Sequence, residues 1–383
     1  MVVIGDHRRT PPFRSPTPRA GGAFAKASSS KGLAFERRNV ARLIGGPLGV
    51  PSSGRGQFTD HASKNATICH WCLWGQAQLT KTAEDQVKIK CLLAAAFAMS
   101  AFTTTAALAQ ERVKLAITNK DWEKPYPGFK VVGNLYYVGT YDLGCYLIDT
   151  GAGLILVNSG APGSYPLIKA NIETLGFKTS DIKIITSTHG HWDHVGDLAL
   201  FQKDAPTART YMSERDAPVL ESGGHLDYRR PQGRGIIYDP IKVDVRTKPG
   251  DHIKLGNTDM TVLQAYGHTP GATSFSFPVT DNGKTYNTFI VNMNGINVGV
   301  KLLGSPGFPT IVEDFKNTLA MQATYTPDIW VSSHAGQFNL HKVYKPGDAH
   351  DPARFGDLAA YRAKVMGYQA AYEKQLAEER AAK

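Results

Sequence analysis

Cysteine is scarce in this chain, with four residues in 383, and only Cys145 lies beyond residue 109. A domain with one cysteine forms no internal disulfide, so packing of its core must hold it together. Cys69 and Cys72 form one Cys-x-x-Cys pair without a second pair at zinc-finger spacing, which favours a chance occurrence. Cys91 precedes an apolar run, whereas a lipid-attachment cysteine would follow one. We therefore expect Cys145 to be a buried core thiol.

Excess charge is also missing from most of the chain. The net charge of +10 is at first sight typical of a nucleic-acid-binding protein. However, residues 1–109 hold 14 Lys+Arg against 5 Asp+Glu, whereas residues 110–383 hold 29 against 28. The positive charge is therefore concentrated near the N-terminus. A near-neutral remainder argues against a nucleic-acid partner.

A long uninterrupted apolar run is lacking as well. From Val87 the chain has two lysines, an apolar stretch interrupted by Ser100 and three threonines, and the ending Ala107-Leu108-Ala109. The stretch is too short for a transmembrane anchor, and its pattern is typical of a bacterial secretory signal peptide over residues 87–109. We therefore expect a periplasmic or secreted protein without a stable membrane anchor.

Residues 1–86 precede this signal and are rich in Arg, Pro, Gly and Ser, with little helical or strand periodicity. Because a signal peptide should begin a chain, we hypothesise that Val87 is the true initiator and that residues 1–86 are translated upstream DNA. A genuine basic, disordered leader is the alternative.

Residues 110–383 show neither an internal repeat nor a linker, which predicts one domain. Short apolar runs between turn residues predict strands at 129–132, 135–138, 145–148, 154–157, 182–185, 208–212, 260–265, 273–277, 286–291 and 329–331. Helical spacing predicts helices at 165–175, 198–201, 213–220, 311–323 and 358–376. Ser213 is the expected N-cap of the third helix. Two similar halves, with sheets covered by helices, are the expected layering.

The segment 187–197 concentrates ligand-type side chains. His189, His191, Asp193 and His194 fall within six residues, directly after the predicted strand 182–185. In an extended segment, residues i and i+2 point to the same side, so His189 and His191 can reach one ion. Asp193 and His194 follow in the expected turn and can face a second ion. The spacing therefore indicates two metal positions.

Two further histidines occur at strand ends. His268 follows the predicted strand 260–265, and His334 follows the strand 329–331. This repeated placement favours their joining the cluster. The remaining histidines of residues 110–383 lack that context, and we interpret them as ordinary surface residues: His225, His252, His341 and His350.

Imidazole and carboxylate ligands suit zinc, while iron or manganese are alternatives. A closed structural zinc site is disfavoured, because no thiolate is near and open positions remain for water. Paired ions convert water to hydroxide near neutral pH and polarise a carbonyl, which amide or ester hydrolysis requires. These residues predict a metal-dependent hydrolase.

The pattern His189-x-His191-x-Asp193-His194, with His268 and His334, resembles the metallo-β-lactamase superfamily across nearly all of residues 110–383. The resemblance implies an α+β fold, a four-layer αββα sandwich. Three further segments are similar to subclass B3 of these enzymes: Tyr137-Val138-Gly139-Thr140, Gly267-His268-Thr269-Pro270-Gly271, and Gly304-Ser305-Pro306 followed by residues 311–315.

The resemblance also implies roles for individual residues. His189, His191 and His268 would bind the first of two Zn²⁺ ions, and Asp193, His194 and His334 the second. A bridging hydroxide would attack the β-lactam carbonyl, with Asp193 as the catalytic residue that orients it and relays a proton. We expect a monomer that acts on a small-molecule β-lactam, an activity that confers antibiotic resistance.

Other hydrolases of the superfamily, such as a glyoxalase II, a lactonase or a ribonuclease, are the alternatives. Those commonly use a metal-bridging aspartate in the region of residues 288–295, and this chain has no Asp between Asp281 and Asp314. The missing carboxylate favours a β-lactamase over an exported hydrolase of a lactone or thioester. A secreted zinc-binding protein without activity is a third hypothesis.

The chain departs from the B3 pattern at two places. Asn294 and Asn297, with Ile296, stand where B3 enzymes usually carry serines that hold the substrate carboxylate or a metal-bound water, so we expect Asn294 and Asn297 to contact substrate. Asn158-Ser159-Gly160 replaces the more usual Asp-Gly-Gly-like turn, which predicts altered support of the metal loop.

Overall fold

The computed structural model describes residues 119–383, so the predicted leader and signal segment lie outside the described residues. The described chain forms two β-sheets, with strand orders β1-β2-β3-β4-β5-β6-β7 and β12-β11-β10-β9-β8. The strands are β1 (Phe129–Val132), β2 (Leu135–Tyr137), β3 (Tyr146–Asp149), β4 (Leu154–Val157), β5 (Ile182–Thr186), β6 (Arg209–Ser213), β7 (Val245–Thr247), β8 (His252–Leu255), β9 (Thr258–Gln264), β10 (Thr273–Asp281), β11 (Lys284–Val291) and β12 (Ile329–Ser332). The α-helices are α2 (Tyr165–Thr174), α3 (Trp192–Val195), α4 (Leu198–Asp204), α5 (Ala217–Glu221), α6 (Ile311–Thr324), α7 (Leu340–Val343) and α8 (Leu358–Ala381).

Strand pairing changes from antiparallel to parallel once within each sheet. In the first sheet, β1 to β4 pair antiparallel, and β4 to β7 then pair parallel. In the second sheet, β8 to β11 pair antiparallel, and β12 joins β11 in parallel, with Phe289 opposite Trp330. The parallel strands β5 and β12 are each followed at the carboxyl end by a histidine-bearing loop.

Three apolar clusters hold the layers together. The largest lies between the sheets and includes Tyr137, Tyr146, Phe275, Phe289 and Val331. The second packs α2, α4 and α5 onto the outer face of the first sheet, through residues such as Leu147, Leu156, Ile168, Phe201 and Leu220. The third joins α6 to α8 through residues such as Phe315, Leu319, Tyr372 and Leu376.

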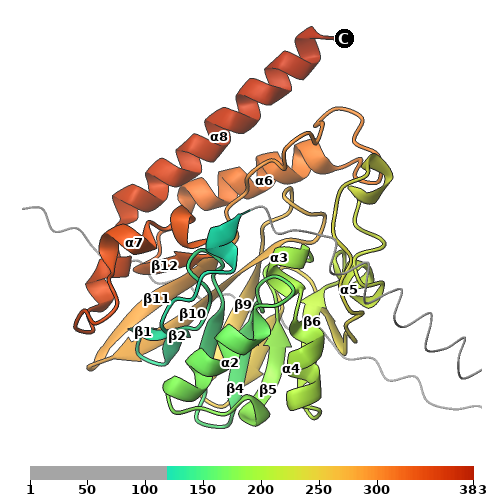
Figure 1. Ribbon diagram of the computed structural model, residues 1–383. Helices are drawn as coiled ribbons and strands as arrows, with labels where there is room; N and C mark the ends of the chain where they lie inside the picture. Colours follow the sequence, from blue (N-terminus) through green and yellow to red (C-terminus); the bar gives the residue numbers. More distant parts are fainter. Residues whose placement is uncertain (1–118) are drawn as a thin grey trace, which may run out of the picture. The chain divides into compact units, whose positions relative to one another are not determined.

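Figure 1 shows α2 and α4 over one sheet and α6 with α8 on the opposite side of the pair of sheets. The order of layers is therefore helix, sheet, sheet, helix, which confirms the predicted four-layer αββα sandwich. The layering follows from the sequence, because each sheet buries apolar residues on both faces and needs a cover on each.

Most predicted elements are present, but the predicted N-cap at Ser213 is wrong. Ser213 ends β6 and caps no helix; α5 begins four residues later, directly after Asp216. Cys145 is fully buried with a free thiol, as predicted. The tail forms α8, the longest helix among residues 119–383, and none of the helices there is long and apolar enough to cross a membrane.

Candidate metal centre

The loop between β5 and α3 carries the histidine pair. Residues 187–191 are buried throughout, and His191 has extended backbone angles where it begins α3. The expected turn beyond it is a single turn of helix, Trp192–Val195, which holds Asp193 and His194. The loop stays close to the sheets because Thr273 donates its backbone N–H to the Thr188 carbonyl at 2.7 Å.

The first predicted set of ligands is brought together. One potential ligand atom from each of His189, His191 and His268 lies within 4.8 Å of the other two. His191 Nδ1 is 3.1 Å from His268 Nε2, and the ring centroids of His189 and His268 are 4.7 Å apart. The His268 ring is oriented by its Nδ1, which lies 2.7 Å from the Gly295 carbonyl oxygen.

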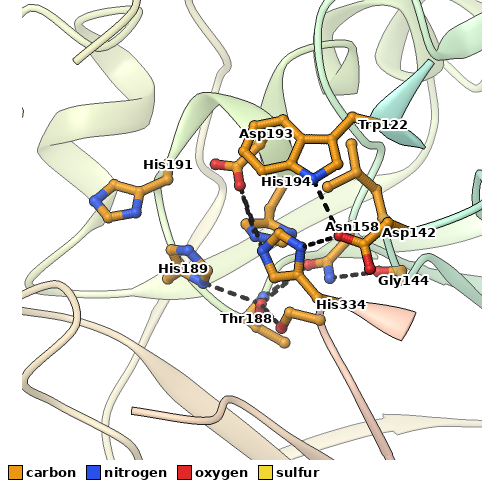
Figure 2. A network of polar contacts seen from close by, with 12 residues as sticks. Trp122, Asp142, Gly144, Asn158, Thr188, His189, His191, Asp193, His194 and His334 are labelled. Carbon is orange, nitrogen blue, oxygen red and sulfur yellow. Dashed lines mark hydrogen bonds and ion pairs between the residues drawn. The ribbon is translucent and has the colours of Figure 1, made fainter. Parts of the chain in front are cut away.

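The second predicted set converges on one carboxylate oxygen. Asp193 Oδ2 lies 3.2 Å from His194 Nε2 and 3.5 Å from His334 Nε2, as Figure 2 shows from close by. The two sets adjoin, because the ring centroids of His189 and His194 are 4.3 Å apart. His189, Asp193 and His194 also offer ligand atoms within 4.8 Å of one another.

These distances fit a metal with four tetrahedral positions. Two nitrogens bound tetrahedrally at the Zn–N distance of about 2.0–2.1 Å lie about 3.3 Å apart, close to the separations found in both sets. The buried atom His189 Nε2 has no hydrogen-bond partner. A buried polar atom without a partner calls for an explanation, and a metal ion at this place supplies it.

Burial governs the protonation of the first set. Desolvation, assisted by nearby positive groups, holds the pKa values of His189 and His191 well below 6.5. Burial likewise lowers the pKa of His268 to about 4. All three imidazoles are therefore neutral at physiological pH, which is the form that binds a metal.

In the second set, burial lowers the pKa of His194 as in the first set, whereas ion pairing decides the protonation of Asp193 and His334. Burial opposes ionisation of Asp193, but its pairing with His194 and His334 outweighs this and lowers the pKa of the carboxyl well below 3.8. For His334, hydrogen bonds with Asp142 and Asp193 outweigh burial and raise the pKa to about 9. His334 thus carries a proton toward Asp193, at the position where a cation would replace it.

Asp142 is a site residue that the sequence analysis missed. Its Oδ2 lies 3.1 Å from His334 Nδ1 and accepts a hydrogen bond from Trp122 Nε1 at 3.0 Å, while Oδ1 accepts from Gly336 N at 3.0 Å. A carboxylate on the outer nitrogen of a ligating histidine fixes its orientation and tautomer. Asp142 is 192 residues from His334, so no local pattern indicated the contact.

Asn158 supports the loop with both ends of its amide. Oδ1 accepts from Ser187 Oγ and from Thr188 N, each at 2.9 Å, and Nδ2 donates to the Gly144 carbonyl at 2.9 Å. An aspartate could accept from the loop but could not donate to Gly144. Asn158 therefore ties the metal loop to the segment before β3 through a bond that an aspartate could not make.

The two predicted substrate residues lie next to the His268 loop. Asn294 is buried, and its Nδ2 donates to the Tyr266 carbonyl at 2.8 Å. Asn297 Nδ2 donates to the His268 carbonyl at 3.0 Å and to Tyr228 Oη at 3.2 Å. Their amide nitrogens are therefore engaged within the chain.

The four histidines interpreted as surface residues stay apart from both sets. His225, His252 and His350 are exposed, whereas His341 is half-buried and stacks on Tyr141 with ring centroids 3.8 Å apart. A cavity of about 710 Å³ opens beside Gly190 and His191, and its lining includes His225, Arg230 and Thr269. This volume is enough for a small-molecule ligand.

Comparison with known proteins agrees with this fold. Residues 144–281 match the family model of the metallo-beta-lactamase superfamily. The chain is similar to the crystal structure of the metallo-beta-lactamase GOB-18 from Elizabethkingia meningoseptica, with 39% identity, 69% of this chain and 97% of that chain covered, and a TM-score of 0.67. It is also similar to the class B3 di-zinc metallo-beta-lactamase LRA-12 from an Alaskan soil metagenome, with 41% identity, 68% and 98% covered, and a TM-score of 0.66.

Curated relatives match over shorter stretches. The Bacillus subtilis protein YobT is 31% identical over 150 residues, which cover 39% of this chain and 61% of that protein. A hydroxyacylglutathione hydrolase from Rhodopseudomonas palustris is 27% identical over 132 residues, covering 34% and 42%. The chain thus spans about half the length of the curated relatives it matches. This chain belongs to the metallo-β-lactamase superfamily and has its hydrolase fold, with solved structures of subclass B3 among its neighbours.

Proposed function

We propose that this protein is a zinc-dependent β-lactamase of the B3 type, which hydrolyses the amide bond of the β-lactam ring and so confers antibiotic resistance. The observation that carries the proposal is the pair of adjoining donor sets that meet at Asp193: His189, His191 and His268 on one side, His194 and His334 on the other. We assign one Zn²⁺ to each set. The similarity to solved β-lactamases over nearly their whole length supports the substrate class.

The end of β11 provides a second argument. Val291 is followed by Asn292, Met293 and Asn294, so no carboxylate occurs where other hydrolases of the superfamily commonly bridge their metals. The Asn292 backbone is engaged instead: its N–H donates to Ser274 Oγ at 3.0 Å, and its carbonyl accepts from Gln322 Nε2 at 2.8 Å. This favours a β-lactam over a lactone or thioester.

Two bound zinc ions would lower the pKa of water to near neutrality and polarise the lactam carbonyl. Asp193, kept ionised by His194 and His334, would orient the attacking water and receive its proton. Asn294 and Asn297 would contact the substrate beside the first set once their amide nitrogens turn away from the carbonyls of Tyr266 and His268. The exposed edges of His268 and His334 would face the substrate, since the other four donors are buried.

The main alternative is hydrolysis of a lactone or thioester by the same centre. The similarity of one third of the chain to hydroxyacylglutathione hydrolases is the observation that favours it.

In either case we propose a monomer that is exported after cleavage behind residue 109. N-terminal sequencing of the exported protein should then begin at Gln110, and a mature chain that retains Arg37 and Arg38 would contradict it.

One substrate panel separates these functions. The purified full chain, loaded with zinc, is tested against a carbapenem, a cephalosporin, a lactone and a thioester. We expect hydrolysis of a β-lactam that a chelator abolishes and added zinc restores. Turnover of only the lactone or thioester would establish the alternative, and bound zinc without turnover of any ester or amide would indicate a zinc-binding protein.

A further inference from the structure

Asp216 stands at the start of α5 with a side chain that does not serve this helix. An aspartate at the N-cap usually accepts a hydrogen bond from the second or third N–H of its own helix. Here the carboxylate makes no capping bond, although the residue is fully buried. A buried carboxylate needs partners to offset the loss of water, and Asp216 finds them elsewhere.

The partners of Asp216 belong to two loops. Oδ2 accepts from Gly190 N at 2.9 Å and from Thr269 Oγ1 at 2.6 Å, and Oδ1 accepts from Gly271 N at 2.7 Å. Gly190 lies between His189 and His191, and Thr269 follows His268. The carboxylate therefore joins the two loops that supply all three histidines of the first set.

The backbone of Gly271 packs directly against Asp216. A Cβ on Gly271 would lie 2.4 Å from Asp216 N and 2.8 Å from its Cγ, so only glycine fits there. On the other side of the histidine loop, Tyr238 Oη donates to the Gly190 carbonyl at 2.9 Å. The N–H and the carbonyl of Gly190 are thus both held by hydrogen bonds. These bonds fix the backbone on which His191 follows.

We propose that Asp216 is a positioning residue for the first metal, because it fixes the separation of His191 from His268 without touching the metal. This inference rests on the proposed function. The second set has its own supports: Asp193 and His194 lie on α3, and Asp142 orients His334. Loss of the Asp216 carboxylate therefore weakens the first metal position and spares the second.

Asp216→Asn tests the proposal with little change in volume. All three partners of the carboxylate are donors, so the amide NH₂ of asparagine must face one of them. We expect zinc affinity at the first position to fall about 10–100-fold, the usual effect of losing an outer partner of a metal site. Competition of a zinc-sensitive dye with the full chain measures both affinities, and cobalt substitution reports by its absorption spectrum which position has changed.

Asp281→Asn is the matched control, because Asp281 is also a buried aspartate that holds loops together, through Gly133 N at 2.8 Å and His350. It should leave both zinc affinities unchanged. Thr269→Val removes one donor to Asp216 and should weaken the first position in the same way, whereas Thr269→Ser should restore it. This pair keeps the proposal testable if Asp216→Asn does not fold.

Three results are informative. If the wild-type chain binds two zinc ions and Asp216→Asn and Thr269→Val bind them equally tightly, the positioning role of Asp216 is overturned and the proposed function is not. If Asp216→Asn lowers the zinc affinity of both positions equally, Asp216 stabilises the fold in general, and its positioning role at the first metal is also overturned. A wild-type chain that binds no zinc overturns the proposed function together with this inference.

Discussion

His334 lies between two carboxylates: its Nε2 is 3.5 Å from Asp193 Oδ2, and its Nδ1 is 3.1 Å from Asp142 Oδ2. Asp193 lies on α3, which follows β5 and its histidine loop, and His334 follows β12 in the other sheet. This imidazole therefore joins the two sheets at the site.

Replacement of Asp193 by Asn should lower kcat/KM for a β-lactam about 10²–10⁴-fold, the range for loss of a group that orients and deprotonates the nucleophile. Steady-state kinetics of the zinc-loaded variant measures this, with zinc content determined in parallel. Activity within a few fold of wild type would remove Asp193 from the mechanism.

Replacement of Asp142 by Asn should weaken the second metal position about 10-fold, because the amide loses the negative charge and one of the two acceptor oxygens that fix the His334 ring. Trp122→Phe is the graded control, since it removes only the indole N–H that donates to Asp142, and we expect less than about a 3-fold effect. Dye competition measures both variants. If Asp142→Asn binds two zinc ions as tightly as wild type, the contact has no role in the site.

The sequence predicted the donors of this site better than their supports. The i, i+2 spacing found His189 and His191, and placement after strands found His268 and His334, because both signals are local. Asp142, Asp216 and the turn that starts α5 were missed, since their partners are 20 to 194 residues away and depend on how the loops pack. For the same reason the local pattern predicts Ser213 as a helix cap, although it is the last residue of β6.

Replacement of Asn158 by Ala should lower the free energy of unfolding by about 2–4 kcal/mol, since buried donors on Ser187 and Thr188 lose their acceptor. Alanine is also unfavourable at the Asn158 backbone angle φ of 65°. Asn158→Asp keeps the acceptor for Ser187 and Thr188, but it replaces the bond to Gly144 with two facing acceptor oxygens, so a smaller loss of about 1–2 kcal/mol is expected. Denaturant unfolding measures both variants, and equal stability of the two would contradict the assigned roles.

The metal-free protein should lose stability as the pH falls from about 6.5 toward 4. His189, His191 and His268 have lowered pKa values when folded, so below pH 6.5 the unfolded chain binds protons that the folded chain does not. Stability then falls with pH, by up to about 1.4 kcal/mol per pH unit for each group.

His334 affects stability at higher pH. Its pKa of about 9 when folded contributes stability that is complete below pH 6.5 and is lost as the pH rises through 9. Denaturant unfolding with chelator at several pH values measures the sum. Because the His334 contribution is constant below pH 6.5, the lowered pKa values of the other site histidines, His189, His191, His194 and His268, decide the trend there. Constant or rising stability between pH 6.5 and 4 would contradict the buried, neutral state of these histidines.

The central claim is that two adjoining donor sets form one hydrolytic centre for β-lactams. Its most direct test is the rate of carbapenem hydrolysis by the metal-free full chain as zinc is added in known equivalents. We predict that activity rises until two equivalents per chain are bound and then stays constant. Two bound equivalents without β-lactam hydrolysis, or full activity in the absence of metal, would contradict the account.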